Sequence, residues 1–488
     1  MRLITLLAIL TLLCLYSGAP LVLSLPTVIL VELLRIFVST PLKKKIPSRF
    51  SGTDCLVLLI AFYPLYIFLA QYQQWWAGDQ GLDFGIFSQI VNQVATTNSF
   101  KTSLISTEWQ NFFTHHFSPY LYLLGWISKL GVPSEISLIG AHALAAAALA
   151  IGIFKLISHI CGSRSLAALV VTCVVISPSV RRAIIWETHD EVLALPFFIW
   201  SIYSFHIKAV PRALYLLLPP LLFKETSGLI VACISICYAY QDKLSRRKAI
   251  KIAVLALISS ILLIYVLPNR MWVSTFDPGA RLGSLSELLA KERIMDKAIW
   301  LLMVSLPALP FIAFGNKDNL RLVVLCIAPI CYTLGTIALT NYEPLYNYKN
   351  YYALPAAVFL VLAAAIFASR QKGFVLAIAL SLCLSITTGE SVRLTRRVFS
   401  VFSNPSAHAE IASFIKPNSR VVVDDYSASV VASENYAVKV SHARRTRPEF
   451  NYIVLNKKHP QNVPEQITRL FVMCHETRSY QVGCRKKG

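Results

Sequence analysis

The chain has 488 residues, of which 56% are hydrophobic and only 15% are charged, and its mean hydropathy is +0.58. Average globular chains carry about 25% charged residues, and a water-soluble fold of this length could not bury so much apolar surface. The composition therefore excludes soluble, fibrous and disordered classes and predicts an all-α polytopic membrane protein in the inner (plasma) membrane.

The formal net charge of +21 has an ordinary explanation in such a protein. Basic residues gather in cytoplasmic loops and are attracted to anionic lipid head groups. The chain contains no P-loop, zinc-finger spacing or RNA-binding signature. We therefore expect the lipid bilayer, and not nucleic acid, as a partner.

The N-terminal region, residues 1–50, holds two apolar stretches and ends near a run of three lysines at 43–45. The small residues Ser17, Gly18 and Ala19 between the stretches would suit cleavage of a signal peptide. The second stretch is apolar as well, which favours a membrane hairpin or one tilted anchor. The lysines are expected in the cytoplasm.

Residues 51–388 form the predicted transmembrane domain, and the chain is expected to have about 11–13 membrane helices. After a first span over Cys55–Tyr72, residues 73–133 form a large external loop. The short basic loops can all be cytoplasmic if Pro119–Leu130 does not cross, and its dozen residues are fewer than the roughly 20 that a span needs. The later spans are predicted over Ile136–Leu156, Leu166–Ile176, Val192–Phe205, the short pair 213–223 and 227–240, Ala249–Leu267, Ala298–Phe314, Leu320–Leu339, Tyr352–Phe367 and Gly373–Ser385.

Residues 389–488 differ in composition and contain no spanning segment. Arg420–Asp424 and Asn451–Asn456 are typical of short strands, and Ala407–Ile415 is typical of a helix, so we predict a small α/β domain. The parity of the spans places this domain outside the cytoplasm. In that oxidising compartment Cys474 and Cys484 are expected to form a disulfide, the alternative being two free thiols.

Polar residues cluster at two places in the predicted external loop. Asp83 opens an amphipathic stretch that continues through Gln89, and by itself it could simply cap a helix. His115 and His116 precede Ser118 and Pro119, and two adjacent imidazoles would also suit the membrane interface. Both clusters are predicted on the external side of the membrane.

Three more clusters belong to the transmembrane domain, and the predicted topology also places them externally. Residues 186–191 carry four ionisable groups in a row, including His189 and Glu191, before an apolar span, which is costly unless they line a wet cavity. Lys224 and Glu225 follow a Pro-Pro break, and they could instead be a mutually neutralising pair. The last membrane loop holds several tyrosines, including Tyr348, that an aromatic belt would explain. Lys349 beside them, like Arg181 and Arg182, is unusual in a short external loop.

Carboxylates, imidazoles and lysines at one external, membrane-level site suit attack on an anomeric carbon whose leaving group is a lipid phosphate. A carboxylate would take the proton from an acceptor hydroxyl, and cations would stabilise the departing phosphate. A lipid tail in the bilayer would explain why such an enzyme is polytopic. The chain has no G-x-S-x-G acyl nucleophile motif.

Several of these motifs occur together in a known order. Asp83-Phe-Gly-Ile-Phe-Ser-Gln89, His116-Phe-Ser-Pro119, His189 and Glu191 before Leu-Ala-Leu-Pro, and Lys224-Glu225 resemble a bacterial family of predicted membrane proteins of unknown function. That family is marked by D-L-G-I-F-x-Q, D-H-F-S-P, F-H-x-E-A-L-A-L-P and K-E-D, and it is similar to the GT-C glycosyltransferases. The resemblance covers about residues 54–455.

The resemblance implies a GT-C-like transferase that moves a sugar from a polyprenyl-phosphate carrier to a glycan, lipid or protein acceptor outside the cytoplasm, with inversion. Asp83 matches the acidic residue that acts as general base. The residues expected to bind substrate are Gln89, His116, His189, Glu191, Lys224, Glu225, Tyr348 and Lys349. Lys224 is assigned to phosphate, and His189 with Glu191 to sugar or acceptor.

Two departures bear on cofactors. His115 and Thr226 stand where the family has aspartates, so the case for a divalent metal is weakened and no cofactor is predicted. Two rival functions remain: a transporter or flippase of a lipid-linked or anionic solute, which inverted repeats would favour, and a non-catalytic envelope-assembly protein.

Overall fold

The computed structural model describes residues 52–76, 80–106, 108–114, 116–263, 291–314, 319–339, 353–369, 371, 373–387, 407–425, 427–432, 435–443, 450–457, 461, 463–477 and 480–486. The predicted N-terminal hairpin or anchor lies outside these residues, as do His115, Tyr348 and Lys349.

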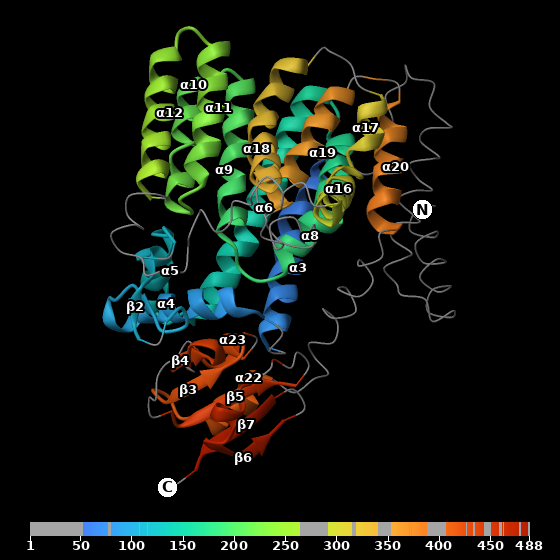
Figure 1. The fold of residues 1–488 in the computed structure, drawn as a ribbon. Helices are drawn as coiled ribbons and strands as arrows, with labels where there is room; N and C mark the ends of the chain where they lie inside the picture. Colours follow the sequence, from blue (N-terminus) through green and yellow to red (C-terminus); the bar gives the residue numbers. More distant parts are fainter. Residues whose placement is uncertain are drawn as a thin grey trace, which may run out of the picture.

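A bundle of helices fills the upper part of the molecule (Figure 1). Its elements are α3 (Gly52–Trp76), α6 (Ser134–Cys161), α7 (Arg164–Ile176), α8 (Pro178–Ile185), α9 (Asp190–His206), α10 (Val210–Tyr215), η3 (Pro219–Leu222), α11 (Ser227–Gln241), α12 (Arg246–Ile261), α16 (Lys291–Ser305), α17 (Leu309–Ala313), α18 (Leu320–Leu339), α19 (Leu354–Ala368) and α20 (Phe374–Thr387). The helix α6 packs against α3, α7 and α9, and α11 packs against α12. The bundle has one continuous apolar core.

Length and apolar composition let two of the described helices, α6 and α18, each cross a membrane alone. The pair α7 and α8 can form a third span, bent by 68°. On α12 the large side chains Val254, Leu257 and Ile258 are exposed, which suits contact with lipid tails. These features agree with the predicted polytopic membrane class.

The helix α8 departs from the prediction, because its residues were expected in a loop beside Arg181 and Arg182. Its side chains Val180, Ala183 and Ile184 are buried, and they recur at the spacing of one helix face. Arg181 is buried as well, while Arg182 stacks over the ring of Trp186. The two arginines hid this short apolar face in the hydropathy pattern.

A five-stranded sheet lies below the bundle in Figure 1, with strand order β4-β3-β5-β7-β6. Its strands and helices are β3 (Arg420–Val423), β4 (Tyr436–Lys439), β5 (Tyr452–Asn456), β6 (Phe471–Glu476), β7 (Tyr480–Arg485), α22 (Ala407–Phe414), α23 (Ala428–Val431), α24 (Val440–Ala443) and α25 (Glu465–Thr468). β3 runs parallel to β4 and β5, and β7 runs antiparallel to β5 and β6. The strands at 420 and 452 and the helix at 407 agree with the predicted α/β domain.

A thin layer separates the bundle from the sheet. It consists of α4 (Leu82–Thr97), β1 (Lys101–Thr102), β2 (Gln110–Asn111), η2 (Phe112–Thr114) and α5 (Tyr120–Lys129). Figure 1 shows α4 lying across the lower ends of the bundle helices, directly above the sheet. With ten residues, α5 is as short as the topology prediction requires.

The sheet docks on this layer through one of its two faces. Successive side chains of a strand point to opposite faces, and Val421, Val423 and Ala437 share an apolar cluster with Phe84 and other residues of α4. Val422, Val438 and Ile453 belong to a separate cluster on the far face. Close packing at Gly85, where a Cβ would lie 2.8 Å from the backbone carbon of Ala428, brings α4 against α23.

Candidate active site

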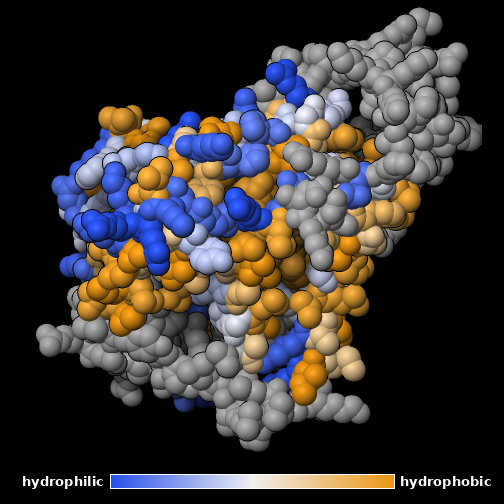
Figure 2. All heavy atoms as spheres, turned by 90° about the horizontal axis from the view of Figure 1, so that it is seen from above, coloured by the Kyte–Doolittle hydropathy of each residue, from blue (hydrophilic) through white to orange (hydrophobic). Residues whose placement is uncertain are grey.

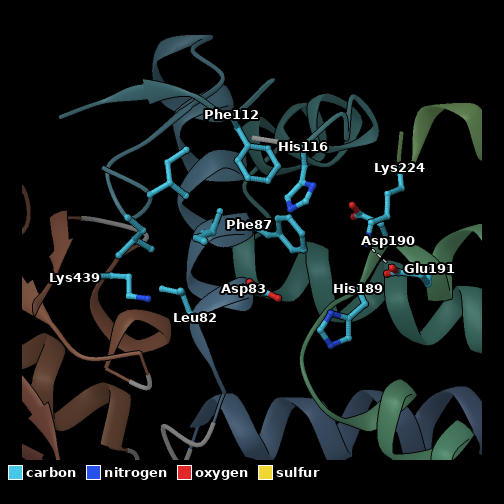
Figure 3. A pocket seen from close by; sticks show the side chains of 13 residues that line it. Leu82, Asp83, Phe87, Phe112, His116, His189, Asp190, Glu191, Lys224 and Lys439 are labelled. Atoms are coloured by element: carbon cyan, nitrogen blue, oxygen red, sulfur yellow. Dashed lines mark hydrogen bonds and ion pairs between the residues drawn. The ribbon is translucent and has the colours of Figure 1, made fainter. Parts of the chain in front are cut away.

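A cavity of about 250 Å³ opens where α4, the layer around η2, the bundle and the sheet meet (Figure 3). One wall is apolar, with Phe87 and Phe112, and the other is polar. Its lining residues are Leu82, Asp83, Ile86, Phe87, Leu104, Ile105, Phe112, His116, His189, Asp190, Glu191, Lys224 and Lys439. The structure therefore brings together Asp83, His116, His189, Glu191 and Lys224, five residues predicted from four separate sequence motifs.

Asp83 stands in the first turn of α4, and the start of that helix is fixed by Glu187. The N-cap residue Gly81 has no side chain that could cap the helix. Instead, the carboxyl group of Glu187 lies against the backbone N–H groups of Asp83 and Phe84, beside donors that a helix start leaves free. A Cβ on Gly81 would lie 1.8 Å from Glu187 Oε1. Only glycine therefore leaves room for this clamp.

The environment of these two carboxyl groups raises both pKa values. Burial raises the pKa of Asp83 above its usual value, although the nearby His116 and Lys224 act in the opposite direction. Burial and the neighbouring Asp83 raise the pKa of Glu187 to about 8, against the effect of the two backbone N–H groups. A raised pKa makes Asp83 a better proton acceptor in its ionised form.

The segment carrying His116 is tied to the bundle by Glu225. His116 Nδ1 lies 3.0 Å from Glu225 Oε1, and the Phe117 backbone N–H donates to Glu225 Oε2 at 3.1 Å. Burial by itself lowers the pKa of His116, but the Glu225 carboxylate outweighs it and the pKa is raised. Burial alone would raise the pKa of Glu225, but the neighbouring His116 and Lys224 outweigh burial and lower this pKa to about 2. The two groups form a charged pair at the edge of the cavity.

Two further carboxylates come from the start of α9. Asp190 accepts hydrogen bonds from Ser118 Oγ and Tyr120 Oη, both at 2.7 Å. Glu191 pairs with the ammonium group of Lys224, which stands in the turn between η3 and α11. His189 is the N-cap residue of the same helix, and burial lowers its pKa well below the usual value, so its imidazole is neutral.

Asp83 differs from the other carboxylates of the cavity. Asp190 is held by two hydroxyl groups and Glu191 by a lysine. Within the described residues, the Asp83 side chain has no hydrogen bond or ion pair, although its carboxylate points toward the cavity between Lys439 and Lys224 (Figure 3). It is therefore the carboxylate that is open to a ligand.

Gln89 lies away from the cavity and connects the layer to the sheet. Its side-chain amide donates to the Asn435 carbonyl at 2.9 Å and to Ser103 Oγ at 3.1 Å, and its carbonyl accepts from the Thr102 hydroxyl at 2.6 Å. Ser103 Oγ in turn donates to the Ala437 carbonyl at 2.7 Å. The buried Gln89 side chain is thus occupied by contacts within the protein.

Three residues of the site were not assigned a role from the sequence. Asp190 and Glu187 belong to the ionisable run at 186–191, so their charge was a signal, but their partners are distant in sequence. Lys439 lines the cavity from the end of β4, and no local pattern marks it.

Cys474 and Cys484, predicted to pair, are joined by a disulfide between β6 and β7, with Cα atoms 5.6 Å apart.

In the described part of the chain, no group of three or more histidine, cysteine, aspartate or glutamate side chains is arranged to hold a metal ion. Two positions where the resembled family has aspartates hold other residues here. His115 lies outside the described residues, and Thr226 has no ionisable group.

Comparison with known proteins supplies a family and a fold. The family described as predicted membrane protein (DUF2079) matches residues 79–481. The crystal structure of ArnT from Cupriavidus metallidurans bound to undecaprenyl phosphate superposes with a TM-score of 0.53 and 12% identity, covering 89% of this chain and 98% of that one. The apo structure of the same protein gives 0.53 and 12%, over 88% and 98% of the two chains. No curated protein sequence matches. The fold is therefore that of ArnT, a GT-C glycosyltransferase.

Proposed function

Because the chain belongs to the DUF2079 family of predicted membrane proteins and has an ArnT-like GT-C fold, we propose that it is a glycosyltransferase. It moves a sugar from a polyprenyl-phosphate carrier to an acceptor outside the cytoplasm. The observation that carries the proposal is an unpaired carboxylate, Asp83, in one cavity with the cation Lys224. These are the two groups that such a displacement needs.

The reaction is a direct displacement at the anomeric carbon. Asp83 accepts the proton of the acceptor hydroxyl while the hydroxyl oxygen forms the new glycosidic bond. The bond between the anomeric carbon and the phosphate oxygen breaks on the opposite side, and polyprenyl phosphate leaves with the electron pair. Lys224 stabilises the negative charge on that phosphate. One displacement inverts the configuration at the anomeric carbon.

The remaining groups orient the substrates in this scheme. His189 is neutral and can exchange hydrogen bonds with sugar hydroxyls, and Glu191 holds Lys224 in place. Glu225 and His116 fix the segment that forms one side of the cavity. Gln89 keeps the sheet docked, and Tyr348 and Lys349 retain their proposed role in substrate binding.

We also propose that the sheet end of the bundle faces outward. The loop between α11 and α12 lies at the opposite, upper end in Figure 1, and Arg246, Arg247 and Lys248 beside it are exposed. Figure 2, seen from that end, shows many hydrophilic side chains gathered on this face among hydrophobic ones. Positive charge favours the cytoplasmic side, and the disulfide at the sheet end suits an oxidising compartment.

The test uses the full chain in lipid nanodiscs with a panel of polyprenyl-phosphate sugars and measures release of free polyprenyl phosphate. We expect release by the wild type and a loss of at least a hundredfold in Asp83→Asn, in the range that removal of a general base costs. Asp296→Asn in α16 changes a carboxylate that does not line the cavity and serves as the matched control. Equal release by wild type and Asp83→Asn would refute the assignment of Asp83, and solute flux without release would indicate a transporter.

A further inference from the structure

A second cation, Lys439, lines the cavity from the sheet domain, and the strand geometry explains its position. Ala437 and Lys439 lie two residues apart on β4, so their side chains share one face. Ala437 packs in the cluster with α4, whereas Val438 between them packs on the far face of the sheet. Lys439 therefore points toward the bundle, as Figure 3 shows.

The docking contacts hold this side chain at a fixed place. The carbonyls of Asn435 and Ala437 accept hydrogen bonds from Gln89 and Ser103, at 2.9 and 2.7 Å. Because these two contacts lie within four residues of Lys439, the strand cannot slide along the layer without breaking them. The sheet is thus positioned to present this lysine.

Lys439 also stands where parallel sheets bind ligands. It is the last residue of β4, and Asp425 follows the end of β3 beside it. The next parallel strand, β5, lies on the other side of β3, so the strand order reverses between β3 and β5, one strand away from Lys439. Ligands of open α/β sheets bind at the carboxyl ends of the strands near such a switch point.

The partner of Lys439 is a carboxylate that a ligand can replace. Lys439 Nζ lies 2.8 Å from Asp425 Oδ1, and the two side chains are 23% and 36% exposed, so the pair is partly accessible from the cavity side. Gln461 donates to the other oxygen of Asp425 at 2.9 Å. Exposed ion pairs are weak, and a phosphate or carboxylate entering the cavity can share or replace this contact.

Lys439 and Lys224 lie on opposite sides of Asp83 (Figure 3). Lys224 belongs to the bundle, where a lipid phosphate would arrive, and Lys439 belongs to the sheet, away from the bilayer. We propose that Lys439 binds an anionic group, a phosphate or a carboxylate, on the substrate that enters from the aqueous side. The inference rests on the proposed function, because it gives the chemical class of the acceptor for the same site.

The test measures amine acetylation of individual lysines by mass spectrometry in the full chain in nanodiscs, with methyl phosphate, glucuronic acid or glucose present. Lys457 is an internal control: it follows the end of β5 and pairs with Glu476 at 2.7 Å, but it does not line the cavity. We expect methyl phosphate or glucuronic acid to slow acetylation of Lys439 about tenfold, glucose to have no effect, and Lys457 to be unchanged by all three. Equal protection of the two lysines, or none, would overturn the proposal.

A second arm separates the two sources of phosphate. Polyprenyl phosphate in the nanodisc should leave Lys439 reactive, whereas equal protection by this lipid and by methyl phosphate would place Lys439 in the donor site and overturn the proposal. Calorimetry with the protecting anion should give about tenfold weaker binding for Lys439→Gln, unchanged binding for Lys439→Arg and Lys457→Gln, and tighter binding for Asp425→Asn. Unchanged binding by Lys439→Gln would also overturn it. None of these measurements requires turnover, so failure of the glycosyltransferase proposal would be seen separately, in the release assay.

Discussion

The clamp between Glu187 and the start of α4 makes Gly81→Ala a severe substitution at a position where the backbone itself would allow alanine, since its φ is −92°. The added Cβ would lie 1.8 Å from Oε1, 2.6 Å from Cδ and 3.1 Å from Oε2 of Glu187. The carboxyl group must move away, and the backbone N–H groups of Asp83 and Phe84 then lose this neighbour. At about 1–2 kcal/mol for each contact, the start of α4 is destabilised by about 2–4 kcal/mol.

Hydrogen exchange of the Asp83 and Phe84 amides in nanodiscs measures this loss directly. We expect their exchange to accelerate by about 30-fold or more, as 2 kcal/mol or more implies, with transfer reduced about a hundredfold because a base misplaced by about 1 Å is ineffective. Gly140→Ala, in α6 with no atom within 4 Å of the added Cβ, should change neither quantity.

A double mutant separates the collision from other effects of alanine. Glu187→Ala removes the clamp by itself, so adding Gly81→Ala to it should cost little more, since both changes break the same contacts. If the two effects simply add, or if Gly81→Ala behaves like Gly140→Ala, then Glu187 does not position Asp83 in the way described.

Three other changes probe the surroundings of the site. Gly85→Ala places a Cβ 2.8 Å from the backbone of α23 and should loosen the docked sheet, seen as faster proteolysis between the bundle and the sheet. Glu225→Gln should lower the free energy of unfolding by about 1–3 kcal/mol, and the loss should be largest between about pH 4.5 and 6.5. Below this range the stabilisation by Glu225 is lost as the pH falls through its pKa of about 2. Above it the stabilisation by His116 is lost as the pH rises through its raised pKa. Reducing the bridge between Cys474 and Cys484 should destabilise the β6–β7 hairpin by about 2–3 kcal/mol, as expected for so short a loop, measured by hydrogen exchange of its amides.

Much of the fold could be predicted from the sequence because apolar blocks and helix length are local properties. The span over Leu320–Leu339 matches α18, and Pro119–Leu130, predicted to be too short to cross, contains the ten-residue helix α5. The helix α8 was missed because its apolar face covers only eight residues and is interrupted by Arg181 and Arg182. Its burial depends on neighbours that hydropathy alone does not reveal.

Only the site residues that belong to local sequence motifs could be predicted. Polar clusters and family motifs on the predicted external side identified Asp83, His189 and Lys224, and these do line one cavity. The hydrogen bond from Gln89 to the Asn435 carbonyl and the position of Lys439 in the cavity both depend on contacts between residues that are far apart in the sequence. They arise from how two folded parts meet. A motif marked Gln89 without revealing its partner on the sheet, and no local pattern marked Lys439.

The ion pair between Lys224 and Glu191 gives a sharper test of the proposed base than Asp83 itself. Lys224 lowers the pKa of Asp83 and Glu191 raises it, while burial remains the larger effect. Lys224→Gln should therefore shift the acidic limb of kcat/KM to higher pH, and Glu191→Gln should shift it to lower pH, whatever each does to the maximal rate. A change that only disturbed packing or phosphate binding would lower the rate without moving the limb. If both variants move it in the same direction, or neither moves it, the titrating base of the reaction is not Asp83.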